Sequence, residues 1–117
     1  MNDNTNSDAL RKLIARLRLH YGERLVGIQQ IGPDTIWNSE DRADAEIVVI
    51  LADGDWRQLD EHRKLAGLTF DSILEDEVYV RAWPVAKAAW ENAPTSSETP
   101  GLVAELRRNA TAVLEVV

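Results

Sequence analysis

Apolar residues recur along much of the chain at the three- and four-residue spacing of an amphipathic helix. This spacing predicts one helix over residues 8–21, which Gly22 ends, and a second over residues 55–75. Residues 1–7 are polar and acidic, and we expect them to form a disordered tail. The apolar positions that carry the two helical patterns are Leu10, Leu13, Ile14, Leu17, Leu59, Leu65, Leu68 and Ile73.

Between and after these helices, shorter apolar runs predict strands. Residues 25–31 form one run, and residues 77–83 form another. The run over residues 45–51 is apolar at five consecutive positions, from Ile47 to Leu51. A strand with this pattern is expected to be covered on both faces, and therefore to lie in the interior of its sheet.

Proline marks two further predicted helices. Pro84 suits the first position of a short helix over residues 84–90, because its missing N–H has no helical partner there. Pro100 similarly follows a capping threonine at the start of a last helix over residues 99–114. The predicted fold is α+β (mixed α/β): a single domain over residues 8–117 with a sheet of three or more strands backed by helices.

Composition narrows the classes of protein. The chain has 117 residues, no cysteine and a formal net charge of −7. The absence of cysteine excludes disulfides and thiolate chemistry, and the net charge makes binding to nucleic acid or an anionic membrane improbable. The basic residues Arg11, Lys12, Arg16 and Arg18 fit a solvated helix face better than a binding patch. With a polar start and no long apolar run, a cytoplasmic location is expected.

Two acids stand one residue apart at the start of the most apolar strand. Asp44 and Glu46 would point to the same face, because side chains alternate along a strand. Two neighbouring carboxylates repel each other unless a positive charge lies between them. Either this strand end is open to water, or the pair binds a cation.

The surroundings of this pair resemble the nucleotidyltransferase superfamily, the DNA polymerase β-like fold, in its small stand-alone "minimal" form. Ile31-Gly32 matches the apolar-Gly start of the family motif, and Asp44-Ala45-Glu46-Ile47 matches its Asp-apolar-acid-apolar end. The predicted order of helices and strands agrees over residues 8–114. The family pairs its two motif strands as neighbours and adds the third strand beside the second.

The resemblance implies a function and a site. A Gly-Ser turn of the family cradles a nucleotide triphosphate, and the paired acids hold Mg²⁺ for transfer of a nucleotide monophosphate. Here Asp44 and Glu46 would be the catalytic and metal-binding residues, and Gly32 and Pro33 would occupy the phosphate-binding turn. Carboxylates are suitable ligands, since Mg²⁺ prefers oxygen and commonly uses one or two carboxylates together with phosphates.

The sequence also departs from the family pattern. Pro33 replaces the second Gly or Ser and supplies neither an N–H nor a hydroxyl, while Asp34 places negative charge where the family has arginine. Each lost charge-assisted phosphate contact is worth about 1.5–3 kcal/mol. Arg81 stands where the third acid is expected, with Asp76 and Glu77 before that strand. An ion pair between Arg81 and the two acids would satisfy them without metal.

Two functions follow from the resemblance. The chain is either a Mg²⁺-dependent nucleotidyltransferase of weakened activity, or a non-catalytic binding module with a degenerate active site. In the second case it would be the antitoxin-like partner of a small helical protein in a toxin–antitoxin pair, or a homo-oligomer. Exposed apolar residues such as Ile36 and Trp37, in the motif loop, would favour this binding role.

Overall fold

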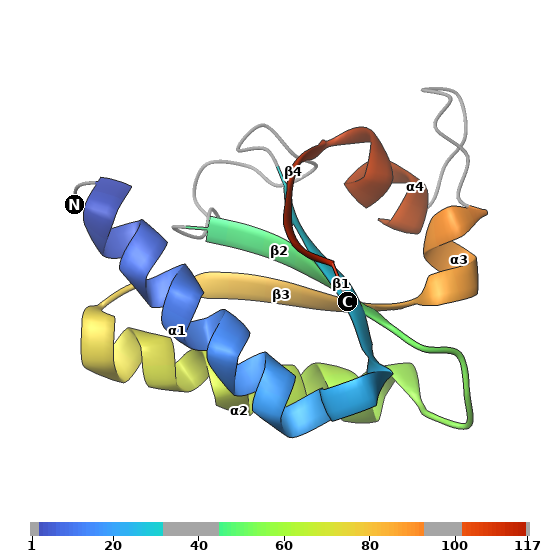
Figure 1. Cartoon of the computed structure of the whole chain (residues 1–117), viewed down its shortest axis with the longest axis horizontal. Helices are drawn as coiled ribbons and strands as arrows, with labels where there is room; N and C mark the ends of the chain where they lie inside the picture. Colours follow the sequence, from blue (N-terminus) through green and yellow to red (C-terminus); the bar gives the residue numbers. More distant parts are fainter. Residues whose placement is uncertain (1–2, 32–44, 93–101, 117) are drawn as a thin grey trace.

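The computed structural model describes residues 3–31, 45–92 and 102–116 and confirms a mixed α+β fold (Figure 1). Within these residues, a four-stranded sheet is backed by helices on both faces. The elements in chain order are α1 (Asp3–Tyr21), η1 (Gly22–Arg24), β1 (Leu25–Ile31), β2 (Ala45–Leu51), α2 (Gln58–Asp76), β3 (Val80–Ala86), α3 (Lys87–Glu91), α4 (Leu102–Arg108) and β4 (Ala110–Val116).

The sheet has the strand order β3-β2-β1-β4. β1 pairs antiparallel with β2 and with β4, whereas β3 runs parallel to β2. The two strands that flank the motif loop are therefore neighbours, and the third lies beside the second, as the sequence analysis expected. The parallel connection from β2 to β3 is made by α2, the usual solution for parallel neighbours.

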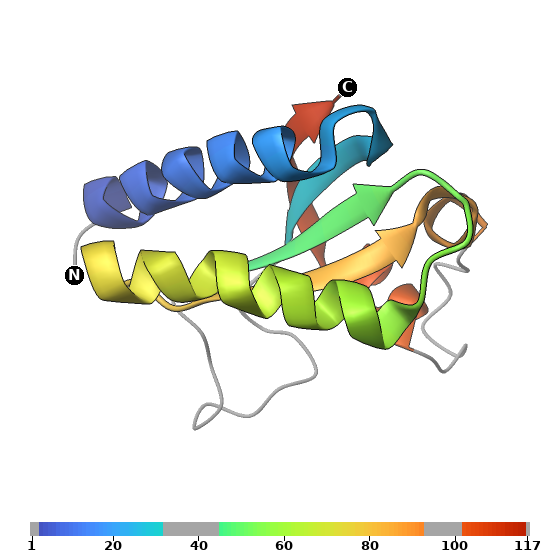
Figure 2. The same cartoon turned by 90° about the horizontal axis from the view of Figure 1, so that it is seen from below.

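The central strand β2 is covered on both faces, which confirms the prediction from its apolar run. Ile47 and Val49 belong to a core under α1 and α2, together with Leu13 and Leu17 of α1. Val48 and Ile50 belong to a second core on the opposite face, with Trp90 of α3 and Leu106 of α4. Figure 2 shows α1 and α2 side by side over the first of these faces.

Helix α1 begins earlier than predicted. It starts at Asp3, so residues 3–7, which the pattern assigned to a tail, are helical. An acidic residue such as Asp3 favours the start of a helix, because the N-terminal end of the helix dipole is positive. The predicted end is correct: Gly22 adopts a left-handed conformation with φ of +55°, which turns the chain out of the helix toward β1.

The prediction for Pro84 was wrong. Pro84 lies within β3, which pairs with β2 through Ala86, and the short helix begins only at Lys87. β3 is an edge strand, where the missing N–H of proline breaks no ladder. The Pro84 carbonyl instead accepts a hydrogen bond of 2.5 Å from Nε2 of Gln58 in α2.

The predicted last helix was also wrong in its second half. α4 ends at Arg108, and residues 110–116 form the edge strand β4 along β1. This segment contains Thr111, Val113 and Val116, and β-branched residues favour strands. Pairing with β4 also gives hydrogen-bond partners to the edge of β1 that does not face β2. This stabilisation depends on residues far apart in the sequence, so the local spacing of apolar residues does not indicate it.

Candidate functional site

Three strand ends meet where the sequence placed its motif. β1 ends at Ile31 and β2 begins at Ala45, and the pairing of Gln30 with Ile47 puts these two ends side by side. The backbone N–H of Ala45 donates to the carbonyl of Tyr79 over 3.2 Å, which brings the start of β3 alongside. The segment 32–44 therefore leaves and returns at adjoining strand ends.

Of the predicted site residues, the structure describes Glu46. Gly32, Pro33 and Asp44 lie outside the described residues, and so do Ile36 and Trp37 of the motif loop. The proposed closeness of Gly32 to the acid pair therefore stays a prediction. Glu46 lies at the second position of β2 and is half-buried.

Neighbours on β3 surround the Glu46 carboxylate. Nε1 of Trp83 donates a hydrogen bond of 2.7 Å to Oε2 of Glu46. In the parallel pairing of β2 with β3, Glu46 lies opposite Arg81, and paired residues of neighbouring strands point to the same face. The Arg81 guanidinium carbon also lies 5.7 Å from the centre of the Tyr79 ring. One carboxylate oxygen is thus engaged by an indole, beside a basic residue.

Trp83 is the site residue that sequence reasoning missed. It was not singled out in the sequence analysis, although its position two residues after Arg81 puts both residues on one face of β3. Its ring also contacts the His62 ring edge-on, with 5.6 Å between the ring centres. The sequence did contain a signal for this contact. Trp83 lies two residues after the position of the expected third acid, on the strand next to that of Glu46.

Neither acid considered as a third metal ligand faces Glu46. Oδ1 of Asp76 accepts a 3.0 Å hydrogen bond from Nζ of Lys12, which pairs α2 with α1. Glu77 ends α2 in a left-handed conformation with φ of 55° and is exposed. Across the described ranges, no group of three or more His, Asp or Glu side chains could hold a metal ion. In these ranges the side chains next to Glu46 do not fit a two-metal site, because Arg81 and Trp83 offer no lone pair to a metal ion.

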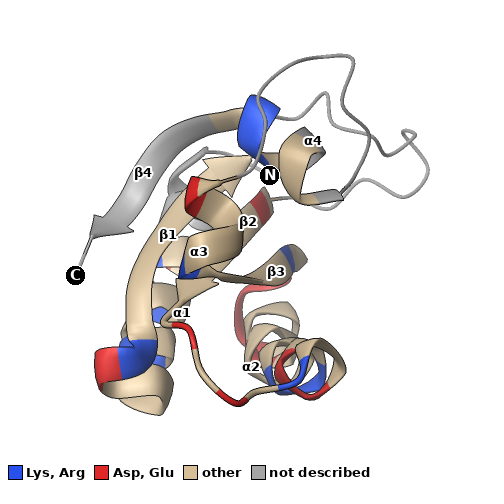
Figure 3. Ribbon diagram, turned by 90° about the vertical axis from the view of Figure 1, so that its right-hand side faces the viewer, with Lys and Arg blue, Asp and Glu red and all other residues tan. Residues whose placement is uncertain are grey.

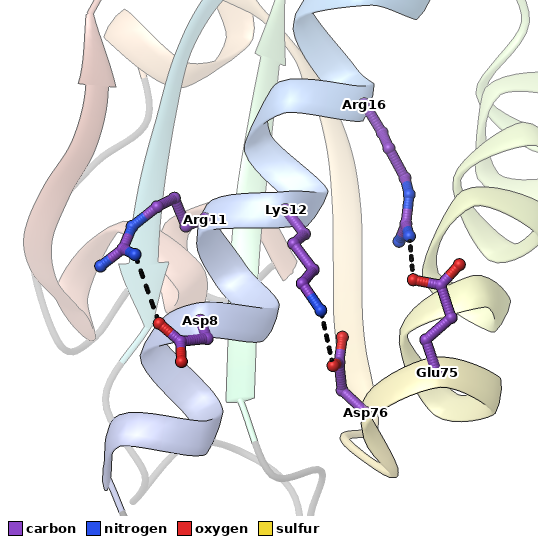
Figure 4. A network of polar contacts seen from close by, with 6 residues as sticks. All are labelled: Asp8, Arg11, Lys12, Arg16, Glu75 and Asp76. Carbon is purple, nitrogen blue, oxygen red and sulfur yellow. Dashed lines mark hydrogen bonds and ion pairs between the residues drawn. The ribbon is translucent and has the colours of Figure 1, made fainter.

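Arg11, Lys12 and Arg18 of α1 are exposed, as expected for a solvated helix face, and three of its basic residues also pair with acids (Figure 4). Lys12 pairs with Asp76 and Arg16 pairs with Glu75 across 2.6 Å, both on α2, while Arg11 pairs with Asp8 over 3.3 Å. The hydrogen bond and charge of Asp76 raise the pKa of the Lys12 amine. The contacts of Lys12 and Arg16 join α1 to α2.

A separate cavity of about 590 Å³ opens at the other end of the sheet, where the loop after β2 enters α2. Figure 3 shows acidic and basic positions side by side in this region. The residues that line it include Arg24, Asp53, Trp56, Arg57, Glu61 and Lys64. No sequence motif indicated it.

The wall of this cavity contains a buried carboxylate. Glu61 is 2% exposed. Its Oε1 accepts a 3.0 Å hydrogen bond from the Arg24 guanidinium and lies 3.5 Å from Nζ of Lys64. Burial raises the pKa of Glu61, but Arg24, Tyr21 and Lys64 outweigh it and hold the pKa below its usual value. Burial, followed by the Glu61 carboxylate, raises the pKa of the Tyr21 hydroxyl. Within this wall, Arg24 and Lys64 neutralise the Glu61 carboxylate.

No described helix is both long and apolar enough to cross a membrane. Comparison of the chain with protein-family models, with curated proteins and with solved structures finds no match.

Proposed function

We propose that the chain is a nucleotidyltransferase-like protein whose transfer activity is weakened or lost. The strand arrangement supports this proposal. β1 and β2 form an antiparallel pair around the motif loop, and β3 adds to β2 in parallel through α2. This is the arrangement that the resemblance implies for the nucleotidyltransferase fold. The fold alone does not determine activity, which depends on the site.

The environment of Glu46 is the observation that carries the loss of activity. Oε2 of Glu46 accepts the Trp83 N–H, which holds the carboxylate against β3 and occupies one of the lone pairs that it could offer to a metal ion. Arg81 is aligned with Glu46 where the family has a third acid, so its positive charge replaces a metal ligand. A cation beside the carboxylate disfavours a second cation by direct repulsion.

The motif sequence adds a second reason. Pro33 and Asp34 remove an N–H donor and add a negative charge where the triphosphate would bind. Each missing charge-assisted contact weakens phosphate binding by about 1.5–3 kcal/mol. Two such losses weaken binding by roughly a hundredfold or more, since about 1.4 kcal/mol corresponds to a factor of ten.

Titration calorimetry with ATP and Mg²⁺ tests this proposal. We expect binding too weak to measure at millimolar nucleotide, and no label transfer from radioactive ATP. The matched control is a variant that reverses the losses, Pro33→Ser with Arg81→Asp, in which binding should strengthen. Tight Mg²⁺-dependent binding by the unaltered chain, abolished by Asp44→Ala with Glu46→Ala, would instead establish an active enzyme that uses these two acids.

A role as a binding module is the second candidate, and exposed apolar side chains on α2 favour it. Leu59, Phe70 and Leu74 are all more than half exposed. Such residues in one row are typical of a protein–protein contact. If the chain is the antitoxin-like partner of a small helical protein, the two proteins co-expressed from neighbouring genes should co-purify. Phe70→Ala should then weaken their association, and an unchanged complex would argue against this face.

A further inference from the structure

The outward face of α2 is more apolar than its buried face. The buried positions are Glu61, Leu65, Thr69 and Ser72, of which one is a large apolar residue. The outward positions include Leu59, Phe70, Ile73 and Leu74, which are 61%, 54%, 38% and 66% exposed. An amphipathic helix normally turns its large apolar side chains toward its own core. Here most of them face away from it.

These residues form a continuous row, which we call the α2 face: Leu59, Arg63, Ala66, Gly67, Phe70, Ile73 and Leu74. Steps of three or four residues connect them, with two adjacent pairs at 66–67 and 73–74, so they lie on one side of the helix. In Figure 2, α1 flanks α2 on one side and the sheet lies behind both helices. The row is long enough to contact another helix over about four to five turns.

The middle of the row is flat. Ala66 is exposed, and a Cβ added to Gly67 would meet no atom within 4 Å. Glycine weakens a helix interior, and nothing in the described part of the chain requires it at this position. Two small residues at the centre of a row let a second helix approach closely.

The charged residues along the α2 face indicate which partner it binds. Exposed Arg63 lies on the N-terminal side of Gly67, and exposed Asp71 lies on the C-terminal side. Their charged neighbours Lys64 and Glu75 already pair with Glu61 and Arg16, and Asp60 is a further exposed acid toward the N-terminal end. Arg63 and Asp71 make no ion pair with other described residues. A half turn about an axis through the middle of the helix brings Arg63 of one copy near Asp71 of another, and Asp71 near Arg63, so these two positions are complementary to themselves.

We propose that the α2 face binds a second copy of this chain, with the two α2 helices antiparallel and crossing at Ala66 and Gly67. In this arrangement Leu59 lies against Leu74 of the other copy, and Arg63 lies over Phe70 and reaches Asp71. A two-fold axis makes each contact twice, as in most homodimers. The contact does not involve the motif loop, and it holds whether or not the chain transfers nucleotides.

Sedimentation equilibrium over a wide concentration range tests the proposal. The mean mass should rise toward that of a dimer. Phe70→Ala should weaken the association by about tenfold, as expected when a central aromatic contact is lost. The matched control is Leu19→Ala, which removes an exposed leucine from α1, 89% exposed and outside the α2 face, and should change nothing. A monomer at every concentration would overturn the proposal and leave the face to another protein.

A charge exchange tests the two-fold geometry itself. Arg63→Glu and Asp71→Arg should each weaken the dimer by about tenfold, because each places like charges opposite one another twice. The double variant should restore it, because the attraction returns with its direction reversed. Both residues are exposed, so folding should not be affected. Failure of the double variant to restore the dimer would refute this pairing.

Disulfide trapping gives an independent measurement, since the chain contains no cysteine. Gly67→Cys places one thiol at the proposed crossing point, where the two Cα atoms would be within reach of a disulfide. Mild oxidation should convert this variant to a covalent dimer. Leu19→Cys is the control and should stay monomeric under the same conditions. Equal trapping of both variants would show random collision and contradict the proposal.

Discussion

The buried ion pair between Glu61 and Arg24 allows a quantitative prediction about stability. Glu61→Gln keeps the shape of the side chain and removes its charge. The substitution removes the charge-assisted hydrogen bond to Arg24, which is 3.0 Å long. Such a bond contributes about 1.5–3 kcal/mol when both groups are shielded from solvent. The Arg24 side chain is 42% exposed, and solvent screening reduces the expected loss to about 1–2 kcal/mol.

The pH dependence follows from the lowered pKa of Glu61. A carboxyl whose pKa falls on folding stabilises the native state at pH above its unfolded value, here 4.5. This contribution is lost as the pH falls through the lower pKa of the folded state. The difference between the unaltered chain and Glu61→Gln should therefore be constant near neutral pH and shrink below about pH 4.

Urea denaturation followed by circular dichroism at several pH values measures both effects. In thermal unfolding at neutral pH, the melting temperature should fall by about 3–8 °C. The matched control is Glu75→Gln, on the same helix. Glu75 also pairs with an arginine, Arg16, but is 54% exposed, so its loss should cost under about 1 kcal/mol. Equal effects of the two substitutions, or a difference for Glu61 that does not depend on pH, would refute the reasoning.

Three further predictions concern the fold. Trp83→Phe removes the 2.7 Å hydrogen bond to Glu46 and should lower the unfolding free energy by about 1 kcal/mol in urea; unchanged stability would indicate that this bond contributes nothing. Gly22→Ala should cost about 1–2 kcal/mol in the same assay, because φ is +55° and alanine disfavours the left-handed region; a stabilised variant would contradict this conformation. Truncation after Asn109 removes β4 and leaves an edge of β1 unpaired, so light scattering should detect aggregation, whereas a soluble, fully folded fragment would show that β4 is dispensable.

Much of the fold could be predicted because local pattern and tertiary role agreed. The unbroken apolar run of β2 requires cover on both faces, and the structure provides it from α1 and α2 on one side and from α3 and α4 on the other. Gly22 ended α1 as expected, because a left-handed turn strongly favours glycine. In these elements a single physical preference decided the outcome.

Other elements depended on neighbours that the local sequence does not name. Pro84 is equally suited to a first helical turn and to an edge strand, and the position of β3 at the sheet edge decided between them. Residues 110–116 became a strand because β1 had a free edge to pair. The site behaved in the same way: Glu46 could be named from its motif, but its contact with Trp83 depends on the register between β2 and β3.

The sequence by itself determined which segments are helical or extended in most of the chain, because amphipathic spacing and glycine are local properties. The sequence also sufficed to single out Glu46 as a candidate site residue, and Pro33 and Asp34 as departures from the family motif. Only the tertiary structure decided which side of α2 faces the core, since the sequence pattern included both Leu59 and Leu65, yet Leu59 is exposed and Leu65 is buried. Periodicity specifies that a helix has two faces, and the packing of the sheet against one of them selects which is covered.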